Sequence, residues 1–173
     1  YRVSDEGWFL SQSKEDEELL KWFKDLCVGT YFEMGGLDGL RYSNTDFFNK
    51  GLNWKGVLVE AFPVNYKKMV QNRPNEIANI HAGVCEKCMD LHWVEAGGEG
   101  GAVGGILEST AESFQKRWWS EAAIQRAQKI QYMPLKDLLY EHVGNKFFLI
   151  SSPLIMKGLN MAHWHPLIST MWP

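Results

Sequence analysis

Residues 31–39 read Tyr-Phe-Glu-Met-Gly-Gly-Leu-Asp-Gly, and residues 57–60 read Val-Leu-Val-Glu. The first segment has the pattern of an apolar strand that enters a glycine-rich loop with an acidic residue. The second has the pattern of an apolar strand that ends in a single carboxylate. Parallel α/β sheets bind an adenosine ribose with such a loop and such a carboxylate, because the two strand ends meet at one edge of the sheet. The two segments therefore predict half of a nucleotide-type cofactor site.

The surrounding sequence predicts an alternation of helices and strands. Apolar residues at helical spacing, after a capping-box pattern at Ser13, predict a helix over residues 13–27. Residues 43–46 are typical of a helix start, for a short helix that Gly51 can end. Pro63 can open the next helix, and residues 77–84 predict a third strand. This order implies parallel pairing with right-handed crossovers.

The second half of the chain has a different pattern of apolar and polar residues. Residues 91–95 alternate like a half-buried strand and precede a glycine-rich stretch, which predicts a β-hairpin insertion near residues 90–106. The glycine stretch lacks the Lys-Ser/Thr and the following helix of a phosphate-binding loop, so a flexible loop is favoured. Further elements are predicted as a helix over 109–128, a strand over 129–132, a helix over 135–143 and a buried strand over 147–150.

Composition favours a single globular α/β domain of 173 residues, with 45% hydrophobic and 23% charged residues. A formal net charge of −3 argues against a nucleic-acid partner, which usually requires a basic surface. No apolar run approaches the ~20 residues of a membrane span, so a soluble protein is expected and the cytoplasm is favoured. The chain begins at Tyr1, so the sequence is compatible with an upstream targeting or anchor segment.

The three cysteines, Cys27, Cys85 and Cys88, are expected to be reduced thiols, because an odd number in a chain of this size does not suggest a disulfide framework. Cys85 and Cys88 form a Cys-x-x-Cys pair. A zinc site would require a second ligand pair, and His81 is the only nearby candidate. No metal site is therefore expected.

Beyond these patterns, many residues match one known family in order and spacing. The matching residues are Ser11, Gln12, Glu15 and Asp16; residues 32–39; Ser43, Asn44 and Thr45; residues 52–61; Pro63 and Tyr66; residues 72–74; and residues 82–85. In these residues the chain resembles the FkbM family of S-adenosylmethionine-dependent methyltransferases, over roughly residues 11–150. The resemblance implies a Rossmann-like class I methyltransferase sheet over residues 1–150, followed by a divergent tail at 151–173.

The resemblance also implies a site for S-adenosylmethionine. It assigns the methionine end and the ribose to the glycine loop, the ribose hydroxyls to the acid that ends the second strand, and the adenine to the residues around it. The implied cofactor-binding residues are Glu33, Gly35, Asp38, Gly39, Asn44, Glu60, Ala61, Phe62 and Val84. Gln12, Glu15 and Asp16 would lie on a helix that covers the site mouth or would simply form a capped, solvated helix start.

Family members transfer the methyl group to an oxygen acceptor, so the implied acceptor is a hydroxyl of a sugar or another small molecule. The family's fourth strand continues into Asp-x-Glu-Gly, whereas residues 147–154 read Phe-Phe-Leu-Ile-Ser-Ser-Pro-Leu. Both carboxylates are absent, no catalytic residue can be named, and the sheet is expected to end in an exposed edge. The alternative is a non-catalytic cofactor-binding or interaction module. A nicotinamide dinucleotide enzyme is less favoured, because the loop is not Gly-x-Gly-x-x-Gly.

Overall fold

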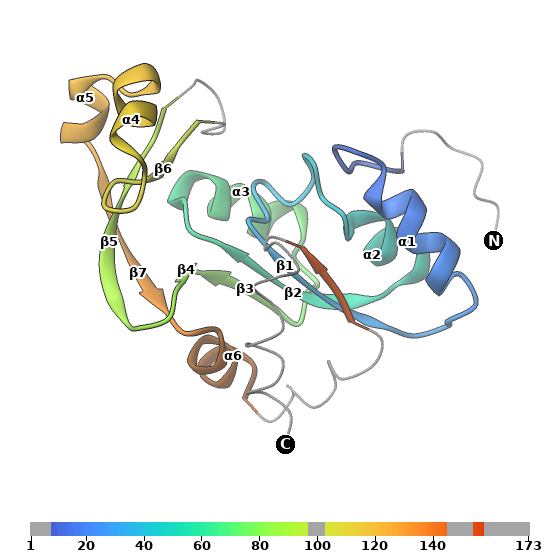
Figure 1. Ribbon diagram of the computed structural model, residues 1–173. Coiled ribbons are helices and arrows are strands. Elements are labelled where there is room, and N and C mark those ends of the chain that lie inside the picture. Colours follow the sequence, from blue (N-terminus) through green and yellow to red (C-terminus); the bar gives the residue numbers. More distant parts are fainter. Residues whose placement is uncertain (1–7, 97–102, 145–153, 158–173) are drawn as a thin grey trace.

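The glycine loop lies on a sheet of four parallel strands, sheet A, in the order β3-β2-β1-β8 (Figure 1). The computed structural model describes residues 8–96, 103–144 and 154–157. The strands of sheet A are β1 (Thr30–Met34), β2 (Lys55–Glu60), β3 (Ala78–His81) and β8 (Leu154–Lys157). The expected α/β class with parallel pairing is thus observed, and the first two strands lie where the sequence predicts them.

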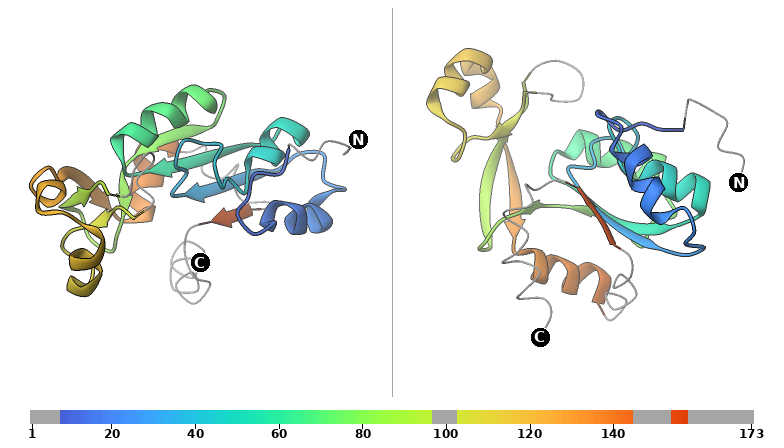
Figure 2. Two further views of the ribbon diagram at one scale, coloured as in Figure 1. Left: turned by 90° about the horizontal axis from the view of Figure 1, so that it is seen from above. Right: turned by 45° about the vertical axis from the view of Figure 1, so that its right-hand side comes forward.

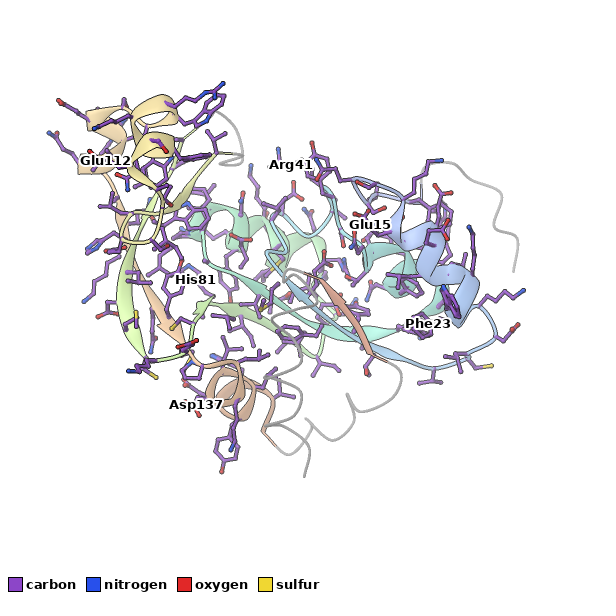
Figure 3. The ribbon with its side chains drawn as sticks, in the orientation of Figure 1. Glu15, Phe23, Arg41, His81, Glu112 and Asp137 are labelled. Atoms are coloured by element: carbon purple, nitrogen blue, oxygen red, sulfur yellow. The ribbon has the colours of Figure 1, made fainter. Side chains whose placement is uncertain are left out.

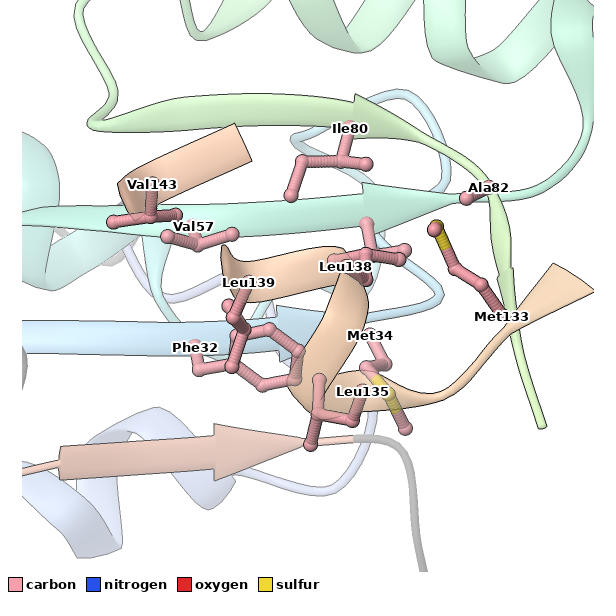
Figure 4. Close-up of a cluster of buried hydrophobic side chains, with 11 residues drawn as sticks. Phe32, Met34, Val57, Ile80, Ala82, Met133, Leu135, Leu138, Leu139 and Val143 are labelled. Carbon is pink, nitrogen blue, oxygen red and sulfur yellow. The ribbon is translucent and has the colours of Figure 1, made fainter. Parts of the chain in front are cut away.

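Helices cover both faces of sheet A (Figure 2). One face carries α1 (Glu15–Phe23), α2 (Asp46–Leu52) and α3 (Pro63–Asn72), and the other carries α6 (Leu135–Val143). Because successive strand residues point to opposite faces, Phe32 packs in the cluster that includes α6, whereas Tyr31 packs with α2 and α3. Figure 4 shows the α6 cluster, in which Phe32, Met34, Val57 and Ile80 of the sheet lie against Leu138 and Leu139. Burial on both faces explains the nearly continuous apolar runs of β1 and β2.

A second sheet, sheet B, extends from the end of β3. Its order is β4-β7-β5-β6, formed by β4 (Gly83–Val84), β7 (Gln128–Met133), β5 (Met89–Val94) and β6 (Gly105–Ile106). The strand predicted over residues 77–84 therefore divides, because its last two residues pair with β7 instead of continuing in sheet A. Gly83 allows this pairing, since a Cβ there would lie 1.9 Å from a ring carbon of Tyr132.

The predicted hairpin insertion is present as β5 and β6. The two strands pair antiparallel, with Trp93 opposite Ile106 and Val94 opposite Gly105, while its glycine-rich tip at 97–102 lies outside the described residues. β5 also pairs antiparallel with β7 along its length. The insertion is therefore part of a sheet and not an isolated hairpin.

Two predicted helices have different bounds in the structure. The helix expected over 13–27 is α1, and its predicted capping box is absent: Lys14 is the N-cap, with φ of 66° and no side-chain cap. Asp16 ties down the preceding segment instead, because its carboxylate accepts the N–H groups of Leu10 and Ser11 at 2.8 and 3.1 Å. Asp16 is fully buried and acts as a structural residue.

The helix expected over 109–128 is two helices, α4 (Glu112–Trp118) and α5 (Glu121–Gln125). The break follows from Ser120, whose side chain accepts the N–H of Ala123 and so begins a new helix. By contrast, α6 has the predicted bounds, and α3 begins at Pro63 as expected.

β8 occupies the fourth position of sheet A, next to β1. Thr30 of β1 lies opposite Leu154, and Glu33 lies opposite Lys157. The strand predicted at 147–150 lies outside the described residues. Residues 154–157 belong to the tail that the sequence marks as divergent, and they form a strand because they pair with β1. Among the described residues, β8 is the last strand on that side of the sheet.

Candidate functional site

The candidate site lies at the carboxyl ends of β1 and β2. The chain proceeds from β1 to β2 and β3 in one direction, and later returns to place β8 on the other side of β1. Loops that leave neighbouring strands in opposite directions open a crevice at such a switch point, and open α/β sheets bind their ligands there. The glycine loop, residues 35–39, begins at this point.

Two glycines of the loop have left-handed backbone conformations. Gly35 has φ of 68°, and among the described residues no atom lies within 4 Å of the position its Cβ would take. Gly39 has φ of 83°, but its Cβ would lie 2.8 Å from Cγ of Arg73. The N–H groups of Gly35 and Gly36 both donate to the carbonyl of Val59, at 2.9 and 3.1 Å. Gly35 therefore faces open space beside β2, whereas Gly39 packs against the interior.

Glu60 joins the glycine loop to the end of β2. Its side chain is buried, with 3% exposure, and its two oxygens accept the N–H groups of Leu37 at 2.9 Å and Phe62 at 2.8 Å. Burial raises the pKa of Glu60 from 4.5 to about 6. A carboxylate has about four acceptor positions, so the side chain keeps capacity for a hydroxyl donor.

Glu33 and Asp38 use their oxygens within the fold. Fully buried Glu33 accepts hydrogen bonds from the hydroxyls of Ser43 and Thr45 and from the N–H of Asn44. These contacts fix the start of α2 against β1. One oxygen of Asp38 accepts the N–H groups of Leu40 and Arg41 at 3.0 and 2.8 Å, which holds the turn after the loop. Both acids therefore shape the loop from within.

The side-chain oxygen of Asn44 differs from those of Glu33 and Asp38 in its hydrogen bonding. The residue is 8% exposed, and its buried Oδ1 has no hydrogen-bond partner in the part of the chain that the structure describes. Leaving a buried polar atom unpaired costs about 1–3 kcal/mol. Asn44 follows Ser43 and precedes Thr45, both of which bind Glu33 at the end of β1. Its oxygen is therefore suited to a donor group of a ligand at the glycine loop.

Residues after β2 and β3 form the other side of the site. Phe62 is buried, and its ring stacks on Trp93 with 6.2 Å between centroids and 23° between planes. The carbonyl of Ala61 lies 3.1 Å from Nε2 of His81, which Figure 3 shows at the end of β3. Val84 lies in β4, opposite Met133. Sequence reasoning missed Trp93, since only the pairing of sheet B brings it to Phe62.

Sequence reasoning also missed the role of Arg73, although the matching segment 72–74 contains it. Its side chain is completely buried and donates to Oε1 of Glu76 at 2.8 Å, to the hydroxyl of Tyr31 at 2.8 Å and to the carbonyl of Gly39 at 3.0 Å. Asp46 at the start of α2 forms an ion pair with it at 3.5 Å. Arg73 therefore connects the glycine loop to β1 and α2 from the interior.

Metal and thiol chemistry have few candidates here. Within the described ranges, no group of three or more His, Cys, Asp or Glu side chains is arranged to hold a metal ion. Cys27, Cys85 and Cys88 are free thiols.

No helix in the described part of the chain has both the length and the apolar content to cross a bilayer.

Comparisons with protein-family models, with curated proteins and with solved structures find no match for this chain. The function is therefore argued from the site itself.

Proposed function

We propose that this chain is a class I methyltransferase domain of the FkbM type, which binds S-adenosylmethionine at the switch point of sheet A. The observation that carries the proposal is Glu60, a buried acid at the end of β2 that accepts a hydrogen bond from Leu37 in the loop after β1. This is the placement in which an acid receives the two hydroxyls of an adenosine ribose.

Three features of the site fit the cofactor. Glu60, when ionised, has acceptor positions left for the ribose hydroxyls. Gly35 leaves open space in which a ligand can approach the main chain closely. The unpartnered Oδ1 of Asn44 matches the ammonium group at the methionine end, because that group offers only donors. Ala61 and Phe62, which follow Glu60 directly, would border the adenine.

The bound cofactor would supply an already activated methyl group. The work of this chain would be to hold that group in line with the hydroxyl of a sugar or another small-molecule acceptor and to exclude water. Glu33 and Asp38 would contribute by fixing the loop and the segment ahead of α2, because their hydrogen bonds are directed to residues 40–45.

A second candidate is a non-catalytic cofactor-binding or interaction module derived from such an enzyme. β8 favours it: the strand in the fourth position reads Leu-Ile-Met-Lys and is followed by Gly-Leu, so it carries neither acid of the family's Asp-x-Glu-Gly motif. Holding the cofactor and transferring its methyl group are therefore separate claims.

Isothermal titration of the full chain with S-adenosylmethionine and S-adenosylhomocysteine tests the shared claim. We expect saturable binding that Glu60→Gln weakens, with Glu141→Gln on the exposed side of α6 as the control. No heat at millimolar ligand would overturn the methyltransferase and the cofactor-binding form of the second candidate. Methyl transfer to any member of a panel of hydroxylated acceptors would then exclude the non-catalytic module.

A further inference from the structure

One face of sheet B turns toward the end of β2. Antiparallel pairing places Leu91 opposite Ile130 and Trp93 opposite Gln128, and residues directly opposite each other lie on the same face. Trp93 and Tyr132 therefore share this face. Trp93 contacts Phe62, and Tyr132 has its pKa raised to about 12 by burial and then by the negative charge of Glu60.

The indole of Trp93 has a donor without an acceptor. Its Nε1 atom is buried and makes no hydrogen bond to any described residue. A buried indole N–H usually finds a partner, because leaving it unpaired costs about 1–3 kcal/mol. The indole is a donor only, so the missing partner must be an acceptor.

An unpaired indole alone does not identify a site. Trp54 also has a buried Nε1 without a partner among the described residues, but it lies in the apolar cluster beneath α1 and α2, against Phe23 and Phe48. Trp93 differs in its surroundings. It lies against Phe62, whose own N–H binds Glu60, the proposed ribose ligand.

We infer that Trp93 is a base-recognition residue, whose indole N–H donates to a ring nitrogen of the adenine held beside Phe62. The inference rests on the proposed function and adds to it a specificity determinant from the hairpin insertion. Recognition would be directed to the ring nitrogens and not to the exocyclic amino group, because that amino group is itself a donor. Sheet B would thus supply the hydrogen bond that recognises the adenine base, while sheet A holds the ribose.

The first test compares the affinity of the native chain, Trp93→Phe and Trp54→Phe for S-adenosylhomocysteine by titration calorimetry. Phenylalanine keeps an aromatic ring against Phe62 and removes the N–H together with part of the ring system, a loss of volume that Trp54→Phe shares. We expect Trp93→Phe to weaken binding about threefold to tenfold, the effect of one hydrogen bond. Trp54→Phe, which removes the same donor from the apolar cluster, should bind like the native chain. Circular dichroism melting of each variant verifies its folding.

The second test identifies the acceptor with the 1-deaza, 3-deaza and 7-deaza analogues, each of which replaces one ring nitrogen by C–H. One analogue should bind the native chain about threefold to tenfold more weakly, yet bind Trp93→Phe as well as the parent ligand does. Equal affinity of native and Trp93→Phe chains, or losses for every analogue that are the same in both chains, would overturn the inference while leaving the proposed function intact. Failure of the native chain to bind S-adenosylhomocysteine would overturn both.

Discussion

Two groups of polar side chains lie near the carboxyl ends of β1 and β2, and they differ in how completely they are paired. The interior cluster consists of Tyr31, Glu33, Ser43, Thr45, Asp46, Arg73 and Glu76, and hydrogen bonds and ion pairs connect its members. Its one buried oxygen without a hydrogen bond among the described residues, Oδ1 of Asp46, lies 3.5 Å from the Arg73 guanidinium in an ion pair. The site edge consists of Asn44, Glu60 and Trp93. There, two polar atoms have no partner among the described residues, and a carboxylate keeps free acceptor positions.

The difference separates folding from binding. Buried polar groups that only support a fold are expected to be paired, because each unpaired group costs free energy. Groups that await a ligand remain unpaired until it binds. Glu33 and Glu60 illustrate this: the family resemblance assigns both buried acids to the cofactor, yet Glu33 binds residues 43–45 ahead of α2, whereas Glu60 binds the N–H of Leu37 in the loop. The predictions below test the two groups against each other.

The largest effect is expected from Arg73→Met in the interior cluster. Removing the guanidinium leaves the carboxylate of Glu76 buried without its cation, a loss that typically costs about 3–5 kcal/mol, whereas Asp46 keeps its ion pair with Lys50 at 2.9 Å. Chemical denaturation measures the free energy of unfolding. Arg117→Met, which removes an arginine from the exposed surface of α4, is the control. A loss below about 1 kcal/mol for Arg73→Met would mean that the cluster does not support the fold.

At the site edge, Glu60→Ala should weaken binding of S-adenosylhomocysteine by about 1–3 kcal/mol, the scale of charge-assisted hydrogen bonds to two hydroxyls. Titration calorimetry gives the dissociation constant, and Glu60→Gln separates charge from shape because its amide keeps one oxygen acceptor. An unchanged affinity in both variants would make Glu60 a second structural acid like Glu33.

The pKa of Glu60 adds a pH test of the same residue. Its folded value of about 6 exceeds its usual 4.5, so the folded state binds its proton more tightly than the unfolded state. The stabilising effect is complete below pH 4.5 and is lost as the pH rises through about 6. At 1.36 kcal/mol per unit, the stability of the native chain relative to Glu60→Gln should fall by about 2 kcal/mol over this window. Denaturation curves at each pH measure the difference.

Cofactor affinity should have the opposite pH dependence. Ribose hydroxyls donate to the ionised carboxylate, so affinity should rise up to pH 6 or so and then level off, as Glu60 loses its proton. Glu60→Gln should remove this dependence. A pH profile that is the same in the native chain and in Glu60→Gln would assign the titration to another group.

Sequence pattern predicts the parts of this molecule in which local signals and the fold agree. Pro63 begins α3, residues 135–143 form α6, and the apolar runs before the glycine loop and Glu60 form β1 and β2. These elements suffice to place Glu60 beside the loop. The predicted capping box fails because Asp16 binds main-chain N–H groups ahead of the helix.

The remaining features depend on contacts between distant segments. β8 forms because residues 154–157 pair with β1, and β4 leaves sheet A because Gly83 can lie under Tyr132. The contact of Trp93 with Phe62 likewise requires sheet B to be complete. No local period reports such pairings, because the residues that decide them are far apart in the chain.

The smallest expected effect distinguishes two neighbouring residues that belong to different groups. Asn44→Ala removes an oxygen without a partner among the described residues, so the free energy of unfolding should stay within about 0.5 kcal/mol, whereas affinity for S-adenosylhomocysteine should fall by about 0.5–1.5 kcal/mol. Thr45→Val is the matched control, because its hydroxyl binds Glu33 and lies 3.3 Å from Nη2 of Arg73. It should lower stability by about 1–3 kcal/mol through the unpaired groups that it leaves, with a smaller effect on affinity in the folded protein. If Asn44→Ala lowers stability as Thr45→Val does and leaves affinity unchanged, Asn44 belongs to the interior cluster, and the methionine end of the proposed site loses its acceptor.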